Sequence, residues 1–535
     1  MKNILIPFIL ILGIQVHLYG QKTKRIDELL THYEKASQFN GTVLVAEKGK
    51  IIFEKSYGYK NAPKREKNTN NSIYTIYSTT KIFTSTVILK LAEQGKLSLS
   101  DKLSKYFPEL PYGDQINIEN LLNHTSGMPG ADDADYTINE ETFLPFISGK
   151  KVDFAPNTSW NYSNSNYYLL GYIIRKVSGM DYDKAISTYI FNPLQMTNSG
   201  FDLKTLQNEN KALGYEFLSD KHSNEALRFK TAHPFGAGAM YSTVEDLWKF
   251  NRGMKNNKIL KQATLEKAQV PYQDKHYGLG YEIDSLYGKK RIGHSGGGPG
   301  YRCRYFNFPE DDITVILLCN AEMNPVDFIT SKITSILYNK PYEIPQNASV
   351  SNDSLQKLEG IYSSKDHDFC VKIIDGLVIF NERNYPRNQL FPISANKFQL
   401  NDNFTFTFKP TPTGEIDSLL INFPNGNKLG GKKVSNTFVW GIAGSATPNG
   451  SEGLDIPLNR DKDKPNIYYL NNYKLNTGDL RFRLNNDPSN SYALNNTGEL
   501  TYNGYDIKVQ EGVYDIVLDM TDQVSPRYTI TKSTK

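Results

Sequence analysis

The chain has 535 residues, of which 39% are hydrophobic and 22% are charged. This length exceeds what a single core organises and predicts two to four domains, while the composition excludes a disordered or membrane-embedded chain. The 61 basic residues nearly balance the 57 acidic ones, and no basic stripe interrupts that balance, so the charge gives no case for a nucleic-acid partner.

The first twenty residues, MKNILIPFILILGIQVHLYG, are typical of a secretory signal. A lysine precedes an apolar run from Ile4 to about Val16, which is too short to span a bilayer, and Gly20 is a small residue suited to cleavage. The alternative is a single membrane anchor. No cysteine follows the run to accept a lipid, and no later stretch is long and apolar enough for a stable membrane span. We therefore expect the mature protein in the periplasm, at the cell surface or secreted.

The first part of the mature chain combines strand and helix patterns. Alternating apolar residues predict a hairpin over 41–58. Spacing and capping residues predict helices over 78–95, 166–178 and 243–254. Further strands are expected over 277–283, 290–293, 300–308 and 313–319. Strands at both ends with helices between them predict an α+β fold for residues 25–340.

After this domain the helical period disappears. A polar, proline-containing stretch predicts a linker over 341–354. Short alternating strands then predict a small antiparallel β domain over 355–434, and a second all-β domain over 436–535.

The chain has three cysteines, Cys303, Cys319 and Cys370. This small, odd number argues against a disulfide framework. Their spacing does not match a metal site, so we expect each to be a small buried apolar side chain.

Ser78-Thr79-Thr80-Lys81 is an S-x-x-K motif at the predicted start of a helix. Helical residues three apart share a face, so Lys81 can reach the Ser78 hydroxyl, and the helix N-terminus favours developing negative charge. A buried lysine near other cations can lose its proton and act as a base. Ser148-Gly149-Lys150-Lys151 has the same form in a predicted loop. The alternative for Ser78 is therefore a helix cap, with Lys81 on a solvated face.

Tyr162-Ser163-Asn164 precedes the second predicted helix. A tyrosine can relay a proton where nearby lysine charge lowers its pKa, and an asparagine can bind both a carbonyl and a lysine. Tyr59-Lys60-Asn61 and Tyr469-Leu470-Asn471 share this spacing. The alternative is a pair of side chains that fixes the start of the helix.

His294-Ser295-Gly296-Gly297 follows a predicted strand. Its small residues would let an extended substrate lie along that strand. The alternative is a glycine-rich turn at the end of the strand.

Together, the three motifs occur in an order that resembles the serine β-lactamase and penicillin-binding protein superfamily. The nearest resemblance is to the branch of class C β-lactamases, D-alanyl-D-alanine carboxypeptidases and D-aminopeptidases, which also contains many esterases. Further matching segments are LLNHTSG at 121–127, TSWNYSNSNYYLLGYIIRKVSG at 158–179 and GAGAMYSTVEDLWKF at 236–250. The resemblance covers about 38–320.

The resemblance implies a role for each motif residue. Ser78 would attack a carbonyl to form an acyl-enzyme, Lys81 and Tyr162 would shuttle its proton, and Asn164 would position the substrate. The backbone N–H groups of Ser78 and Gly297 would form an oxyanion hole. The third motif, with His294, Ser295 and Gly296, would bind substrate. The resemblance implies no metal and no organic cofactor.

The third motif departs from the family pattern. Many relatives have K-T-G, and here His294 stands in the position of the lysine. A lysine is cationic at pH 7 and suits a substrate carboxylate, whereas a histidine can be neutral. His294 would either relay a proton or hydrogen-bond to Tyr162, and it argues against efficient β-lactam hydrolysis.

The C-terminal half carries two further resemblances. Residues 355–433 resemble a lipocalin-like domain that often follows these hydrolases. Residues 437–535 resemble surface glycan-binding domains of Bacteroidetes starch-utilisation proteins, through segments such as VWGIAGSATPNG and GDLRFRLNND. Trp440, Tyr473 or Tyr492 would then stack on a sugar ring, and the alternative for each is a place in the core.

The sequence thus predicts an exported serine hydrolase that cleaves a small ester, amide or D-amino-acid peptide. Whether the last domain binds polysaccharide is left open by the sequence. One alternative is a true β-lactamase, and another is a non-catalytic glycan-binding envelope protein on a hydrolase scaffold. The acyl pocket is expected to depend on residues 130–154 and 218–231.

Overall fold

The structure is a computed structural model that describes residues 5–130, 140–227, 235–344, 348–385, 387–401, 404–435, 438–495 and 497–533. The first four residues of the predicted signal, part of each predicted acyl-pocket segment and three residues of the predicted linker lie outside these ranges. The chain forms two compact units, Met1–Gly214 with Arg228–Tyr342 and Tyr215–Leu227 with Glu343–Lys535.

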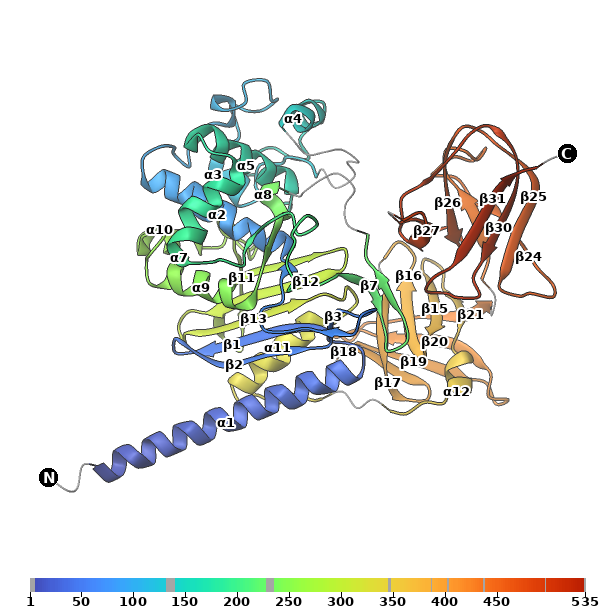
Figure 1. Ribbon diagram of the computed structural model, residues 1–535, viewed down its shortest axis with the longest axis horizontal. Helices are drawn as coiled ribbons and strands as arrows, with labels where there is room; N and C mark the ends of the chain where they lie inside the picture. The colour runs from blue at the N-terminus through green and yellow to red at the C-terminus, as the bar shows by residue number, and fades with distance from the viewer. Residues whose placement is uncertain are drawn as a thin grey trace. The chain divides into compact units, whose positions relative to one another are not determined.

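The first unit is built on a six-stranded antiparallel sheet (Figure 1). Its order is β10 (Glu282–Leu286), β11 (Lys289–Gly298), β12 (Tyr301–Phe308), β13 (Ile313–Cys319), β1 (Gly41–Glu47) and β2 (Lys50–Tyr57). The predicted hairpin is confirmed, with a turn at Lys48 and Gly49, where φ is +52° and +76°. One predicted strand starts too early, because Tyr277 makes only an isolated bridge to Glu282 before β10 begins.

Helices cover both faces of this sheet. On one face, α1 (Leu5–Lys35) packs against β2, and α11 (Val326–Leu337) packs against β12 and β13. On the other face, α9 (Val244–Lys255) packs against β13 and β1, and α2 (Thr80–Glu93) packs against β11. Within the described ranges, no helix has both the length and the apolar character needed to cross a membrane.

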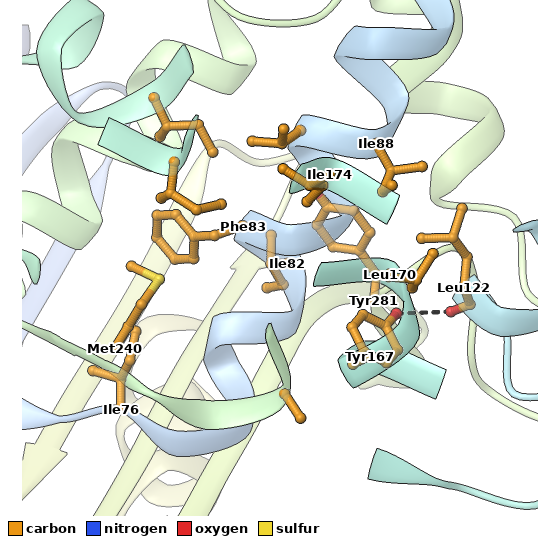
Figure 2. Close-up of a cluster of buried hydrophobic side chains, with 14 of the residues drawn as sticks. Ile76, Ile82, Phe83, Ile88, Leu122, Tyr167, Leu170, Ile174, Met240 and Tyr281 are labelled. Atoms are coloured by element: carbon orange, nitrogen blue, oxygen red, sulfur yellow. Dashed lines mark hydrogen bonds between the residues drawn. The ribbon is translucent and has the colours of Figure 1, made fainter. Parts of the chain in front are cut away.

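The α2 helix is almost wholly buried, since α5 (Asn164–Ser178) packs beside it. Figure 2 shows the cluster that results, with Ile88 of α2 near Leu170 and Ile174 of α5. Phe83 of α2 packs instead against Phe191 and Phe250. This packing explains why the helix shows no polar face, in contrast to the amphipathic α9. Thr243 caps α9, and its side chain accepts a hydrogen bond from Asp246 N at 3.2 Å.

The remaining elements of the first unit are short: β3 (Tyr59–Asn61), β4 (Glu66–Lys67), β5 (Tyr74–Thr75), η1 (Tyr77–Thr79), η2 (Leu103–Lys105), α3 (Ile118–Leu122), α4 (Glu140–Ser148), α6 (Tyr182–Ile186), η3 (Ser187–Phe191), α7 (Asn192–Leu194), β6 (Gly200–Phe201), α8 (Phe235–Gly238), β9 (Met240–Ser242) and α10 (Gln262–Ala268).

The second unit contains a closed eight-stranded barrel. After the short helix α12 (Asn352–Gln356), its strands run in chain order: β14 (Gly360–Ser363), β15 (Asp368–Ile374), β16 (Leu377–Glu382), β17 (Asn388–Ser394), β18 (Lys397–Asn401), β19 (Phe404–Pro410), β20 (Ile416–Asn422) and β21 (Lys428–Ser435). Apolar side chains such as Phe398, Phe406 and Phe408 form its own core.

Two further sheets of this unit pack around one core. The first contains β22 (Trp440–Ala443), β23 (Ile456–Pro457), β26 (Gly478–Leu484), β27 (Asp487–Leu494), β28 (Leu500–Tyr502) and β29 (Ile507–Val509). The second contains β24 (Asn459–Arg460), β25 (Ile467–Leu475), β30 (Gly512–Asp519) and β31 (Arg527–Lys532). Trp440 and Tyr492 are 1% and 2% exposed. Their proposed sugar-stacking role is therefore wrong and the core alternative is right.

A hairpin from the middle of the first predicted domain belongs to the second unit. It consists of β7 (Tyr215–Leu218) and β8 (Ser223–Glu225). Glu216 pairs with Arg387, and Ser219 Oγ donates to Asp375 at 2.5 Å. The sequence placed this hairpin in the first domain, because no local signal marks such an excursion.

All three cysteines are free and buried, as predicted. Burial raises the pKa of the Cys303 thiol to about 12 and that of the Cys319 thiol to about 11. These side chains therefore stay protonated and inert.

Candidate active site

Ser78 lies in the short helix η1, which continues directly into α2. The residue before it, Tyr77, has a φ of +44°, a conformation that costs a non-glycine residue about 1–3 kcal/mol. Tyr77 is fixed there by its hydroxyl, which donates to Pro299 O at 2.8 Å. This strained turn presents the Ser78 hydroxyl at the start of the buried helix.

Lys81 is fully buried, with 0% of its surface exposed. Its Nζ lies 3.1 Å from Ser78 Oγ, 2.8 Å from Asn164 Oδ1 and 2.7 Å from Ala237 O. The last two atoms can only accept hydrogen bonds. A neutral amine would give its two N–H groups to them and direct its lone pair at the Ser78 hydroxyl, the arrangement of a base beside a nucleophile.

Tyr162 and Asn164 reach the same place from the start of α5. Ser163 is the N-cap residue and Asn164 the first helical residue, so the chain turns sharply there. The Tyr162 ring centroid lies 4.8 Å from Lys81 Nζ. The second motif therefore meets the first around the lysine.

The third motif lies within β11 and does not follow the strand as predicted. Gly296 packs so closely against η1 that an added Cβ would lie 2.0 Å from Ile76 O. Thr79 Oγ1 also donates to His294 O, at 3.3 Å. Only glycine allows this approach, which brings the strand against the helix that carries Ser78.

Comparison with known proteins agrees with this geometry. A family model described as Beta-lactamase matches residues 26–334. The chain is 30% identical to penicillin-binding protein 4* of Bacillus subtilis (strain 168), over 71% of this chain and 92% of that protein.

The chain belongs to the beta-lactamase family.

Two solved structures support the same assignment. A penicillin-binding protein from Bacillus halodurans is 26% identical with a TM-score of 0.51, over 58% of this chain and 98% of that one. An octameric penicillin-binding protein homologue from Pyrococcus abyssi is 25% identical with a TM-score of 0.53, over 75% and 98% of the two chains. As a member of the beta-lactamase family, the chain is a serine hydrolase.

In this family member, His294 makes contacts other than the predicted bond to Tyr162. Its side chain is 1% exposed. Nδ1 lies 2.5 Å from Ser295 O, so it carries the proton, and Nε2 accepts a hydrogen bond from the Tyr277 hydroxyl at 2.9 Å. The Tyr162 ring is 6.4 Å away, centroid to centroid. Burial is the main cause that lowers the pKa of His294, which favours the neutral ring.

Ser295 does not lie free for a substrate either. Its Oγ donates to Glu282 Oε1 at 2.5 Å, and the two residues lie on the neighbouring strands β11 and β10. This bond ties the third motif to the edge of the sheet.

Sequence reasoning missed three residues that contact the motif residues: Ala237, Tyr277 and His124. Ala237 lies in the family-like segment 236–250, but nothing in the sequence shows that its carbonyl accepts a hydrogen bond from Lys81. Tyr277 was assigned to a strand, and it is instead the partner of His294. His124 lies in the quoted LLNHTSG segment, where a histidine between small polar residues was the available signal.

Two other copies of these patterns, at Ser148 and at Asn61, make local hydrogen bonds. Ser148 ends α4, with its Oγ donating to Pro145 O at 3.0 Å, and Lys151 is exposed. Asn61 Oδ1 accepts from Lys64 N in a surface turn. In the described residues no cluster of histidine, cysteine and acidic side chains could hold a metal ion.

Proposed function

We propose that the chain is an exported acyl hydrolase that cleaves an ester or amide through a Ser78 acyl-enzyme. The observation that carries this proposal is the environment of Lys81 Nζ, 3.1 Å from Ser78 Oγ and within hydrogen-bond reach of two acceptors. Burial disfavours the charged form of such an amine, which suits it to take the serine proton.

In the acylation step, Ser78 Oγ attacks the substrate carbonyl carbon as its proton passes to Lys81 Nζ. A tetrahedral intermediate forms, and its collapse breaks the bond to the leaving alcohol or amine. Tyr162, whose ring lies 4.8 Å from Nζ, gives its phenolic proton to that leaving group and takes up the proton held by Lys81. Water then attacks the acyl-enzyme by the reverse route and releases the acid.

The negative oxygen of both intermediates would lie between the backbone N–H groups of Ser78 and Gly297. Support comes from the close approach of β11 to η1 at Gly296, one residue before Gly297. A donor of this kind is worth about 3–4 kcal/mol of transition-state stabilisation. Asn164, which accepts from Lys81, would orient the substrate carbonyl.

The third motif favours substrates that need no cationic partner at this position. His294 is buried and bonded to Tyr277 and Ser295, so its ring offers no ammonium-like charge to a substrate carboxylate. We therefore favour esters, amides or D-amino-acid peptides over β-lactams as substrates. Acylation by penicillin is the second candidate activity, which the name of the Bacillus subtilis relative favours.

Export is part of the proposal. Its support is the lysine, the apolar run and Gly20 within the first twenty residues. We test this by sequencing the N-terminal peptide of protein recovered from a cell-envelope or culture fraction. A start just after Gly20 supports export with signal cleavage, and an intact Met1 in that fraction contradicts cleavage.

The nucleophile is tested with a fluorophosphonate probe, in which a Ser78 O–P bond forms as fluoride leaves. We expect stoichiometric labelling of the wild type, no labelling of Ser78→Ala, and full labelling of the matched control Ser148→Ala. Equal labelling of the wild type and Ser78→Ala would overturn the proposal. Turnover of p-nitrophenyl esters, D-amino-acid amides and nitrocefin by the same three proteins then identifies the substrate class.

A further inference from the structure

His124 is a buried histidine that none of these steps uses. It lies two residues after α3, 0% exposed, with a φ of +63°. A residue other than glycine is strained in that conformation, and such strain persists only where surrounding contacts fix it. The contacts of His124 identify what is fixed.

The backbone and ring of His124 bind the two N–H groups on either side of Tyr162. His124 O accepts from Asn161 N at 3.2 Å, and His124 Nδ1 accepts from Ser163 N at 3.1 Å. The left-handed turn is what allows one residue to direct its carbonyl and its side chain at the same segment. Tyr162 is thereby held at both of its peptide neighbours.

The same imidazole also packs against the phenol itself. The His124 and Tyr162 ring centroids lie 4.4 Å apart with 34° between the planes. Lys81 Nζ lies 4.8 Å from that Tyr162 centroid. His124 therefore restricts both the backbone and the ring of the residue beside Lys81.

The protonation state of His124 follows from its contacts. Because Nδ1 accepts, the proton lies on Nε2, which has no hydrogen-bond partner among the described residues. Leaving a buried N–H unbonded costs about 1–3 kcal/mol. Burial is the main cause that lowers the pKa of His124, and it keeps the ring neutral. Histidine combines a flat ring with a hydrogen-bond acceptor. Phenylalanine has only the ring, asparagine has only the acceptor, and leucine has neither.

We propose that His124 is a positioning residue that holds Tyr162 in the orientation needed for proton transfer with Lys81 and Ser78. The proposal rests on the proposed function of Ser78. It predicts a defect in the chemical step with little change in substrate binding.

The test compares His124→Leu, which lacks the acceptor, with His124→Asn, whose Oδ1 can replace Nδ1. Each variant is assayed for the rate of Ser78 labelling by fluorophosphonate, for kcat and KM with p-nitrophenyl acetate, and for melting temperature. Thr125→Val is the matched control, since it removes a buried hydrogen bond to Asn123 from the same loop without touching Tyr162.

We expect His124→Leu to lower kcat and the labelling rate about 10–100-fold, with KM changed less than about threefold, because small misplacements of reacting groups cost this much. His124→Asn should recover to within about fivefold of the wild type. Thr125→Val should lower the melting temperature and leave the labelling rate within about twofold.

Equal rates for His124→Leu and the wild type, or equal defects in the Leu and Asn variants, would overturn the positioning role. If His124→Leu does not fold, His124→Gln replaces it, because its amide reaches the Nε2 position and cannot supply the acceptor at Nδ1. The proposed function fails separately, when the wild type itself shows no Ser78-dependent labelling.

Discussion

The chain contains two Ser-x-x-Lys segments, and their surroundings differ completely. In the first, Lys81 is fully buried and its Nζ contacts Ser78, Asn164 and Ala237. In the second, Ser148 is half-buried and bonds to its own helix, and Lys151 is exposed. The S-x-x-K spacing alone therefore does not identify a nucleophile. Burial of the lysine and hydrogen-bond partners from other elements distinguish the two segments.

The difference begins with the local backbone. Ser78 starts a helix, so Lys81 lies one turn ahead of it on the same face. Ser148 ends a helix, so the residues that follow leave the helical path. Only the first arrangement brings the lysine nitrogen and the hydroxyl together, and only there do α5 and α8 supply acceptors.

The largest effect is expected when Lys81 is replaced and is compared with the same replacement of Lys151. Lys81→Met should lower turnover about 10³-fold or more, since the base is lost. It should also cost about 1–3 kcal/mol of stability, because Asn164 Oδ1 and Ala237 O lose a buried donor. The measurements are kcat/KM on the best ester and a urea unfolding curve. Lys151→Met, the matched control, should match the wild type in kcat/KM and in stability. An equal loss in the two variants would show that the buried setting of Lys81 does not matter.

A smaller effect is expected for two glycines. Gly296→Ala would place a Cβ 2.0 Å from Ile76 O, whereas a Cβ at Gly149 would meet nothing closer than 3.7 Å. We expect Gly296→Ala to move β11 away from η1 and lower Ser78 labelling about 10–100-fold. Gly149→Ala should change stability by less than about 0.5 kcal/mol. Wild-type labelling of Gly296→Ala would show that this close contact does not matter for the site.

Much of the fold could be predicted because its signals are local. Thr243 caps α9 within its own turn, and Ile313–Cys319 is a short, almost wholly apolar run that is buried throughout. The hairpin β7–β8 could not be assigned to the second unit, because Glu216 meets Arg387, far along the chain. Trp440 and Tyr492 were ambiguous because aromatic residues suit both a sugar-binding surface and a core.

The candidate site was predictable only in part, for the same reason. Ser78 and Lys81 are three residues apart, so helix geometry alone relates them. The contact between His124 Nδ1 and Ser163 N spans 39 residues. Tyr277 lies in an irregular segment before β10, and its bond to His294 depends on how that segment folds back. Contacts of this kind follow from tertiary packing, which no local pattern encodes.

The smallest effect is expected for Ser148→Ala. The Ser148 hydroxyl donates to Pro145 O on the exposed end of α4, a bond that water replaces at little cost. We expect turnover within about twofold of the wild type and a free energy of unfolding within about 0.5 kcal/mol. Both are measured beside Ser78→Ala, whose stability should also change little while its turnover disappears. If Ser148→Ala loses turnover, the S-x-x-K pattern acts outside the buried setting, and the contrast between the two segments is wrong.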